Sequence, residues 1–311
     1  SVISGNTTEA GGTATFTITL ESQPTNNVTI ALSSSDTSEG TVAASVVKTP
    51  ANWNLATAVT VTGVDDAEVD GDVAYTIVTG NVTSGYENYN ALNGGDVGNV
   101  AVINTDNDAI GVNISPISGN TTEGGGTATF TVTLDSQPTN NVTIALSSSD
   151  TSEGTVPASI VKTSANWDNN TVVTVTGVDD ALVDGDVGYT IVTGNVTSGD
   201  ANYNALNGSD VADVAVINTD NDTVGVNVSA ISGNTTEAGG TSTFSVTLDS
   251  QPSNDVTIAL SSSDTGEGTV PASVIKTPAN WDSNTVVTVT GVDDTIVDGD
   301  VAYTIVTGNV T

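Results

Sequence analysis

The stretch "GVDDAEVDGDVAY" at residues 63–75 concentrates acidic side chains in a short segment. Five carboxylates fall within eight residues, at Asp65, Asp66, Glu68, Asp70 and Asp72. In water two carboxylates about 5 Å apart repel each other by roughly 1 kcal/mol, and several such pairs add up. A folded chain accommodates this charge if solvent surrounds the loop or if a cation binds in it. Oxygen ligands suit hard cations such as calcium, so the loop is a candidate cation site.

The composition excludes several classes of function. The chain has 37 acidic residues against three lysines, with no arginine, histidine or cysteine, and its net charge is −34. Nucleic acid and anionic membranes are excluded as partners, because binding to their phosphates depends on Lys and Arg. The usual general bases, thiolate nucleophiles and nitrogen or sulfur zinc ligands are also missing. What remains is oxygen chemistry, which suits hard cations.

The sequence repeats with a step of 114 residues. "SGNTTEAGGTATFTITL" at 4–20 returns as "SGNTTEGGGTATFTVTL" and as "SGNTTEAGGTSTFSVTL", and the same step relates Trp53, Trp167 and Trp281. A unit of this length is far longer than a solenoid repeat and can hold a core of its own. We therefore expect three domains, at 1–108 (first strand absent), 109–222 (complete) and 223–311 (last strands absent).

Within each unit, apolar residues alternate with polar ones, which indicates half-buried strands. In "TATFTITL" the apolar side chains from Ala14 to Leu20 share one face and the threonines share the other. One full repeat length has seven such segments, at 13–20, 27–34, 41–48, 57–64, 73–79, 97–104 and 109–115. Turn-forming residues separate them, and no segment has a helical period. The pattern predicts an all-β protein of two-sheet antiparallel sandwiches, with Trp53 and Tyr75 as core aromatics.

Several motifs together resemble a known family. "TEAGGTATFTITL", "KTPANW", "VTVTGVDDAEVDGDVAYTIVTG" and the closing "VINTDND" resemble the Calx-beta repeat, in the form found in tandem in large bacterial surface and adhesin-like proteins. The resemblance covers nearly the whole unit and recurs three times. It implies immunoglobulin-like antiparallel β-sandwiches arranged as extended beads in a row. It also implies Ca²⁺ as the cofactor, bound by acidic loops at one pole of each sandwich, next to the following domain.

Carried over residue by residue, the resemblance implies calcium ligands in every unit. In the first unit they are Glu9, Asp36, Asp65, Asp66, Asp70, Asp72, Asp106 and Asp108, with Glu39 near Asp36. In the second unit they are Glu123, Asp150, Asp179, Asp180, Asp184, Asp186, Asp220 and Asp222. In the third unit they are Glu237, Asp264, Asp293, Asp294, Asp298 and Asp300. The sequence departs from some calcium-binding members in its terminal run, where "NTDND" alternates aspartate with asparagine.

Two alternatives to a cation site stay open. Asp and Gly are ordinary turn residues, so an acidic loop between strands also fits a solvated turn. Strong acidity is also a solubility device of halophiles, which predicts acids spread over the whole surface. In the first unit, however, eight of the thirteen acids fall in the segments that the resemblance assigns to one pole.

Three classes of function follow from these patterns. The favoured class is an extracellular or cell-surface structural or adhesive protein, in which calcium stiffens tandem sandwiches into a rod or filament. Its partners are neighbouring repeats or copies of the chain. The alternative is a carbohydrate-binding surface module for surface glycans or a host or cell surface, whose exposed aromatics would have to be Tyr86 or Tyr89. An enzyme that uses paired carboxylates is not expected, because three near-identical copies offer no unique cleft.

The sequence contains no apolar run of 18 or more residues and no basic segment followed by an apolar stretch at its start. We therefore expect a soluble chain whose targeting signal lies outside this sequence. The third unit stops at Thr311, before the segment that corresponds to residues 84–114. We interpret the chain as a segment of a longer repetitive protein.

Overall fold

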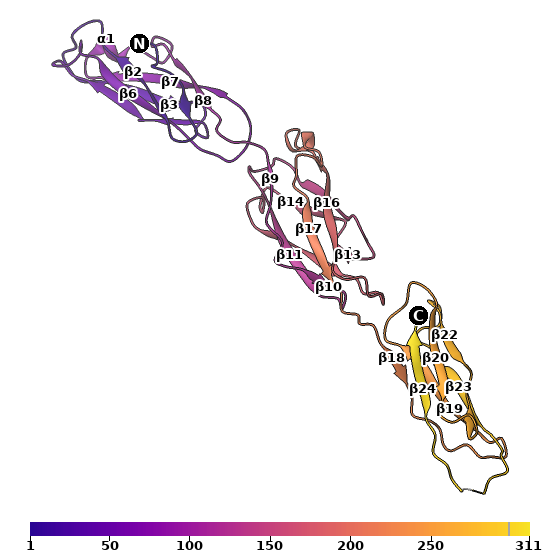
Figure 1. Ribbon diagram of the computed structural model, residues 1–311. Helices are drawn as coiled ribbons and strands as arrows, with labels where there is room; N and C mark the ends of the chain where they lie inside the picture. The colour runs from indigo at the N-terminus through magenta and orange to yellow at the C-terminus, as the bar shows by residue number, and fades with distance from the viewer. Residues whose placement is uncertain (298) are drawn as a thin grey trace.

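Three β-sandwich domains follow one another along the chain in an extended row (Figure 1). The structure, a computed structural model, describes residues 1–297 and 299–311. We use the ranges 1–108, 109–222 and 223–311 as the first, second and third domain. Helical structure in the described residues is limited to α1 (Glu87–Asn90) and the 3₁₀ turn η1 (Tyr203–Ala205), and no described helix is long and apolar enough to cross a bilayer. The predicted all-β fold of tandem sandwiches is confirmed.

The first domain packs a five-stranded sheet, in the order β1-β8-β7-β3-β5, against a three-stranded sheet, β2-β6-β4. Phe16 and Val59 from the smaller sheet share one core with Ile30 and Ile77 from the larger sheet. The strands are β1 (Thr7–Thr8), β2 (Thr13–Ile18), β3 (Val28–Ser34), β4 (Gly40–Val42), β5 (Ser45–Lys48), β6 (Thr57–Gly63), β7 (Val73–Ser84) and β8 (Val100–Thr105).

The second domain repeats this arrangement and adds a strand. Its sheets are β10-β17-β16-β12-β14 and β13-β15-β11-β9. The added strand β9 pairs with β11 through Val112↔Leu134 and Ile114↔Val132. The strands are β9 (Val112–Ile114), β10 (Thr121–Thr122), β11 (Thr127–Leu134), β12 (Val142–Ser148), β13 (Gly154–Thr155), β14 (Ser159–Lys162), β15 (Thr171–Gly177), β16 (Val187–Ser198) and β17 (Val214–Thr219).

The third domain has a four-stranded sheet, β18-β19-β23-β21, and a three-stranded sheet, β22-β20-β24. Its second sheet therefore has two strands fewer than the sheet β10-β17-β16-β12-β14, within the residues that the structure describes. The strands are β18 (Val226–Val228), β19 (Thr241–Leu248), β20 (Val256–Ser262), β21 (Gly268–Thr269), β22 (Ser273–Lys276), β23 (Thr285–Gly291) and β24 (Ile305–Val310).

The alternation read from the sequence matches the register of the strands. Ala14 lies opposite Val61, and these residues are 2 % and 0 % exposed. Thr15 and Thr60 are also cross-strand partners, and both are exposed. One face of the pair β2-β6 therefore builds the core while the other faces solvent, because successive side chains of a strand point to opposite faces.

Three details differ from the sequence prediction. The segment 41–48 is two strands in different sheets: β4 pairs with β6 and β5 pairs with β3, so the chain crosses between the sheets there. The segment 73–79 continues to Ser84, because a bulge opposite Ala31 lets β7 keep pairing with β3. Gly80 lies at this bulge, where an added Cβ would come within 3.1 Å of the Ala31 side chain. The third detail is α1, which is a single turn and too short to show a period.

The three lysines lie in the domain cores and none is exposed to solvent: Lys48, Lys162 and Lys276 are all 0 % exposed. The Lys162 ammonium donates to the backbone oxygens of Val132 and Asn169 and to the Thr171 hydroxyl, at 3.2, 2.5 and 2.9 Å. These three bonds use the three donors of the ammonium group. Burial lowers the pKa of each lysine. The lysine ammonium groups are thus occupied by neutral oxygens.

Candidate metal centre

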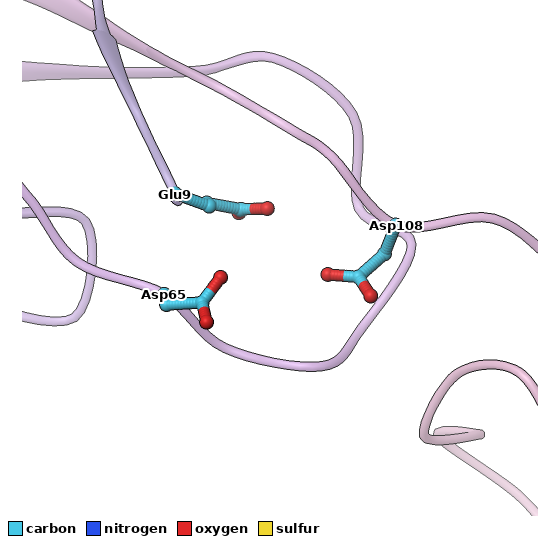
Figure 2. A group of neighbouring side chains, drawn as sticks. All are labelled: Glu9, Asp65 and Asp108. Atoms are coloured by element: carbon cyan, nitrogen blue, oxygen red, sulfur yellow. The ribbon is translucent and has the colours of Figure 1, made fainter. Parts of the chain in front are cut away.

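The first acidic cluster consists of Glu9, Asp65 and Asp108. Their side chains point toward one another from three separate segments (Figure 2). Glu9 follows β1, Asp65 follows β6 and Asp108 follows β8, so three strand ends meet at one pole of the sandwich. One carboxylate oxygen from each residue lies within 4.8 Å of the other two. Glu9 is only 1 % exposed, although it carries a carboxylate.

A second cluster beside it consists of Glu39, Asp66 and Asp70, with oxygens again within 4.8 Å of one another. Glu39 immediately precedes β4 and is 5 % exposed. Asp66 and Asp70 belong to the acidic loop between β6 and β7. This loop turns at Gly71, whose φ of +78° is a left-handed conformation that favours glycine.

The second domain reproduces both clusters. Glu153, Asp180 and Asp184 are the counterparts of the second cluster, and Glu123, Asp220 and Asp222 form a version of the first. Asp179, the counterpart of Asp65, instead accepts a hydrogen bond from the Asn221 side chain at 3.2 Å. The same pole of each domain therefore gathers two groups of carboxylates.

The third domain differs in the acids that the structure describes. Among its described residues no three carboxylates lie as close as in the first two domains. Glu237 is exposed, whereas its counterpart Glu9 is buried. The predicted ligand Asp298 lies outside the described residues, and the other predicted ligands here are Asp264, Asp293, Asp294 and Asp300. The third domain has no described strand in the position of β8 or β17, after which the terminal aspartates of the other domains follow.

Some predicted ligands lie near the clusters but accept hydrogen bonds from the loops themselves. The Asp106 carboxylate accepts from the backbone N–H groups of Gly71 and Asp108, both at 2.7 Å. Asp72 accepts from the Asp106 N–H at 3.3 Å. The Oδ1 atom of Asp36 accepts from the N–H and the hydroxyl of Ser38. The second domain repeats these roles in Asp150, Asp186 and Asp220, of which Asp220 is also a cluster member. These aspartates fix the loops that carry the cluster residues.

A buried polar network holds Glu39 in place. Asn104 donates from its side-chain amide to the Glu39 carboxylate at 3.3 Å and to the Val64 backbone oxygen at 3.0 Å. The Asn104 side-chain oxygen accepts from the Thr7 hydroxyl at 3.0 Å, and that hydroxyl shares a bond with Tyr75 at 3.0 Å. The second domain repeats the network with Thr121, Tyr189, Asn218 and Glu153. The cluster is therefore built on the core of the sandwich.

Burial and mutual repulsion raise the pKa values of seven of the clustered acids, whereas backbone hydrogen bonds lower the pKa of the cluster member Asp220. Burial raises the pKa of Glu9 to about 7, against the lowering effect of a hydrogen bond from the Asn107 N–H, and the nearby Asp106 raises it further. Burial is also the largest cause of the raised pKa of Glu39, Asp70, Asp108, Glu123, Glu153 and Asp222. In contrast, hydrogen bonds from Ser38 lower the pKa of Asp36. Ionising these acids within the clusters therefore costs free energy, and a bound cation would offset that cost.

The geometry of the clusters fits a calcium ion. Calcium binds oxygens at about 2.3 to 2.6 Å, so two ligands of one ion are at most roughly 5 Å apart. The separations within each cluster satisfy this limit. In addition, the Oδ2 atoms of Asp108 and Asp222 are buried and have no hydrogen-bond partner among the described residues. Buried polar atoms usually have a partner, so two oxygens without one are suited to ligate a cation.

Glu39 and Glu153 were not among the ligands predicted from the sequence, where Glu39 was noted only as near Asp36. Their position in the repeat was the feature of the sequence that could have indicated them. In each of the first two domains a glutamate comes one residue before the same short strand, β4 or β13. What places it in the cluster is its contact with Asn104, 65 residues further along the chain.

The aromatic residues proposed for carbohydrate binding are not exposed. Tyr89 is 9 % exposed, and its hydroxyl donates to the Ser22 backbone oxygen at 2.6 Å. Tyr86 is half-buried against the same core, with its ring centroid 6.1 Å from that of Tyr89. In the second domain the counterpart of Tyr86 is Asp200. The structure therefore offers no pair of exposed aromatic rings at this place.

No family model matches the sequence, and no curated protein matches it. Among solved structures, the chain resembles CBD12 from CALX1.2 at 12 % identity and a TM-score of 0.28, over 64 % of this chain and 79 % of that one. It also resembles domains 4–9 of the surface layer protein SbsC at 19 % identity and a TM-score of 0.27, over 96 % of this chain and 41 % of that one. Domains 4 and 5 of SbsC give 15 % identity and a TM-score of 0.25, over 70 % and 92 %. At these values the likeness concerns the kind of fold and says nothing of the site.

Proposed function

We propose that this chain is an extracellular structural or adhesive repeat protein whose sandwiches are held in line by calcium at their acidic poles. The observation that carries the proposal is that one loop serves two purposes. The loop 65–72 supplies carboxylates to both clusters of the first domain, and the same loop contacts the second domain.

The contacts between the domains lie among the cluster residues of this loop. The backbone oxygen of Ala67 accepts from the Gln137 N–H at 2.6 Å, and that of Val69 accepts from the Asn202 side chain at 2.7 Å. Asp66 and Asp70 flank these two residues. At the next junction the Ala181 oxygen accepts from the Gln251 N–H, also at 2.6 Å. An ion bound by Asp66 and Asp70 would therefore fix the loop conformation that presents these oxygens.

Without a cation, we expect the same loop to be more mobile. Its carboxylates repel one another, and the lysines are occupied in the cores. Calcium would remove the repulsion and select the docked loop, so the row of domains would bend less. Resistance to bending suits a rod on a bacterial or other cell surface. The acidic, cysteine-free composition is compatible with an extracellular location.

Small-angle X-ray scattering of the full chain tests the proposal. We expect a narrow, extended distance distribution in calcium and a broader distribution with a shorter mean length in chelator. The double variant Asp66→Asn and Asp180→Asn should resemble the chelated chain even in calcium. Glu68→Gln is the matched control, because it removes one charge from the same loop at a residue outside both clusters. Scattering curves that are identical with and without calcium would rule out stiffening.

A further inference from the structure

The linker between the first two domains is anchored on both sides. On the side of the first domain, the Asp108 N–H donates to the Asp106 carboxylate at 2.7 Å. On the side of the second domain, the Gly111 backbone oxygen accepts from the Asp135 N–H at 3.1 Å. Residues 109–110 lie between these anchors and make no backbone hydrogen bond within the residues that the structure describes. These two residues can therefore act as a hinge, which is usually a few such positions.

The second junction has the same arrangement. The Asp222 N–H donates to the Asp220 carboxylate at 2.7 Å, and the Gly225 oxygen accepts from the Asp249 N–H at 3.0 Å. Residues 223–224 lie between these anchors, again without a backbone hydrogen bond among the described residues. A hinge of two residues is therefore a repeated feature of the row of domains.

Two donors of the second domain restrain the first hinge. The Gln137 N–H donates to the Ala67 backbone oxygen at 2.6 Å, and the Asn202 side chain donates to the Val69 backbone oxygen at 2.7 Å. We call these two hydrogen bonds the docking contact. Because both acceptors are backbone oxygens, the second domain recognises the course of the loop 65–72 and not the side chains of the two residues that accept.

The docking contact is loosely packed. A cavity of about 210 Å³ lies beside it, and its lining includes Glu68, Asp70, Ile110, Asp200 and Asn202. Protein interiors contain few voids larger than a water molecule, so a cavity of this size shows that the two domains do not interdigitate here. The docking contact therefore depends on its hydrogen bonds more than on apolar burial.

One buried carboxylate joins the two segments that carry the donors. Asp200 is 8 % exposed, and its Oδ1 atom accepts from the Asn202 N–H at 2.9 Å. Its Oδ2 atom accepts from the N–H and the hydroxyl of Thr139, at 2.9 and 3.0 Å, and Thr139 lies two residues after Gln137. In the first domain the counterpart of Asp200 is Tyr86, which packs against the core. The sandwich therefore folds without a carboxylate at this position, which points to a role of Asp200 at the junction.

We propose that the second domain carries a receiving surface for the loop 65–72, in which Asp200 is the positioning residue that presents Asn202 and Gln137 to the loop. Forming the docking contact fixes the hinge at residues 109–110, and losing either hydrogen bond lets the two domains swing about it. Calcium acts on the loop, whereas Asp200 acts on the surface that receives it. The coupling of the docking contact to calcium rests on the proposed function, but the role of Asp200 does not.

The test measures the distance between the first two domains in the full chain by pulsed EPR. The chain has no cysteine, so Val47→Cys and Val161→Cys, at residues that are 44 % and 45 % exposed, supply two unique sites for nitroxide labels. In calcium the labelled parent should give a narrow distance distribution, and Asn202→Ala should lose it. Asn202 is exposed, so this variant should keep the urea stability of the parent. Asp210→Asn is the matched control, because this carboxylate of the same β16–β17 connection accepts from Asn207 in its own turn.

The role of Asp200 is tested by Asp200→Asn. This variant should widen the distance distribution as Asn202→Ala does. It should also speed hydrogen exchange of the Gln137 amide about fivefold, the effect of losing one hydrogen bond of ordinary strength. A role confined to the second domain would lower its urea stability and leave both the distance distribution and the Gln137 exchange unchanged. That result would overturn the assignment of Asp200 as a positioning residue.

Measurements in calcium and in chelator separate the receiving surface from the effect of calcium. If Asn202→Ala keeps the narrow distribution of the parent in calcium, the receiving surface is overturned, while stiffening by calcium is unaffected. If the parent gives the same distribution in calcium and in chelator and Asn202→Ala widens both, the receiving surface is supported and stiffening by calcium is contradicted.

Discussion

The side-chain amide of Asn104 donates to the buried carboxylate of Glu39 across 65 residues of sequence, at 3.3 Å. Asn104 is 1 % exposed and lies on β8, whereas Glu39 precedes β4 in the other sheet. The bond therefore ties the two sheets together at the acidic pole and sets the position of a cluster carboxylate.

Replacing Asn104 by alanine should weaken both the fold and calcium binding. The variant removes the amide donor of the buried Glu39 carboxylate and of the Val64 backbone oxygen, whereas the Thr7 hydroxyl keeps its bond to Tyr75. Leaving a buried polar group unpaired typically costs about 1 to 3 kcal/mol of stability. Urea denaturation in chelator measures the stability, and a calcium titration measures the binding. Asn107→Ala is the control, since Asn107 contributes to Glu9 through its backbone N–H, which alanine retains. Equal calcium affinity in Asn104→Ala and the parent chain would show that the network does not position the cluster.

Gly40 should not tolerate a side chain. An added Cβ would lie 2.2 Å from the Tyr75 hydroxyl, which belongs to the same network. Gly40→Ala should therefore displace Tyr75 and destabilise the first domain by about 1 to 3 kcal/mol, as overpacking does. Gly5→Ala provides the comparison, because nothing lies within 4 Å of its added Cβ. Thermal unfolding of the two variants should differ clearly, and equal melting temperatures would contradict the packing described here.

The strands could be predicted from the sequence because their alternation reports directly which side chains face the core. Phe16 and Val59 lie in the core, as the pattern of their strands predicted. The division of 41–48 into β4 and β5 could not be predicted, since alternation does not reveal which sheet a strand joins. Four residues such as those of α1 are also too few to show a helical period.

The candidate site was predictable only in part. The acidic loop 65–72 stands out by its charge density, which repulsion makes unfavourable without a partner. The meeting of Glu9 with Asp108, 99 residues apart, depends on the fold and was expected only through the family resemblance. The place of Glu39 in a cluster depends on Asn104, and nothing local in "SEGTV" distinguishes it from a turn glutamate.

The stability of the chain in chelator should fall as the pH rises from about 4.5 to 7. The pKa of Glu9 is raised from 4.5 to about 7, so in this range the folded state binds more protons than the unfolded state. Unfolding free energy then decreases with pH. Glu39, Asp70 and Asp108 act in the same direction. The lowered pKa of Asp36 acts only below its ordinary value of 3.8, outside this window.

Calcium should reverse this trend, because the ion competes with protons for the same oxygens. Thermal melts at pH 5 and pH 7.5, each with calcium and with chelator, give four melting temperatures that test this prediction. Glu9→Gln should reduce the pH dependence in chelator. A melting temperature in chelator that rises over this pH range would contradict the assigned burial of these acids.

The most direct test is a calcium titration of the full chain by calorimetry at moderate salt. The four acidic groups of the first two domains predict saturable binding of about four ions per chain. Each site should add roughly 1.4 kcal/mol of stability at ion concentrations about ten times the dissociation constant. The variant with Glu9→Gln and Asp66→Asn should lose the ions of the first domain and keep those of the second. Absence of saturable binding, together with melts that superimpose in calcium and chelator, would contradict the account and favour solvated acidic turns.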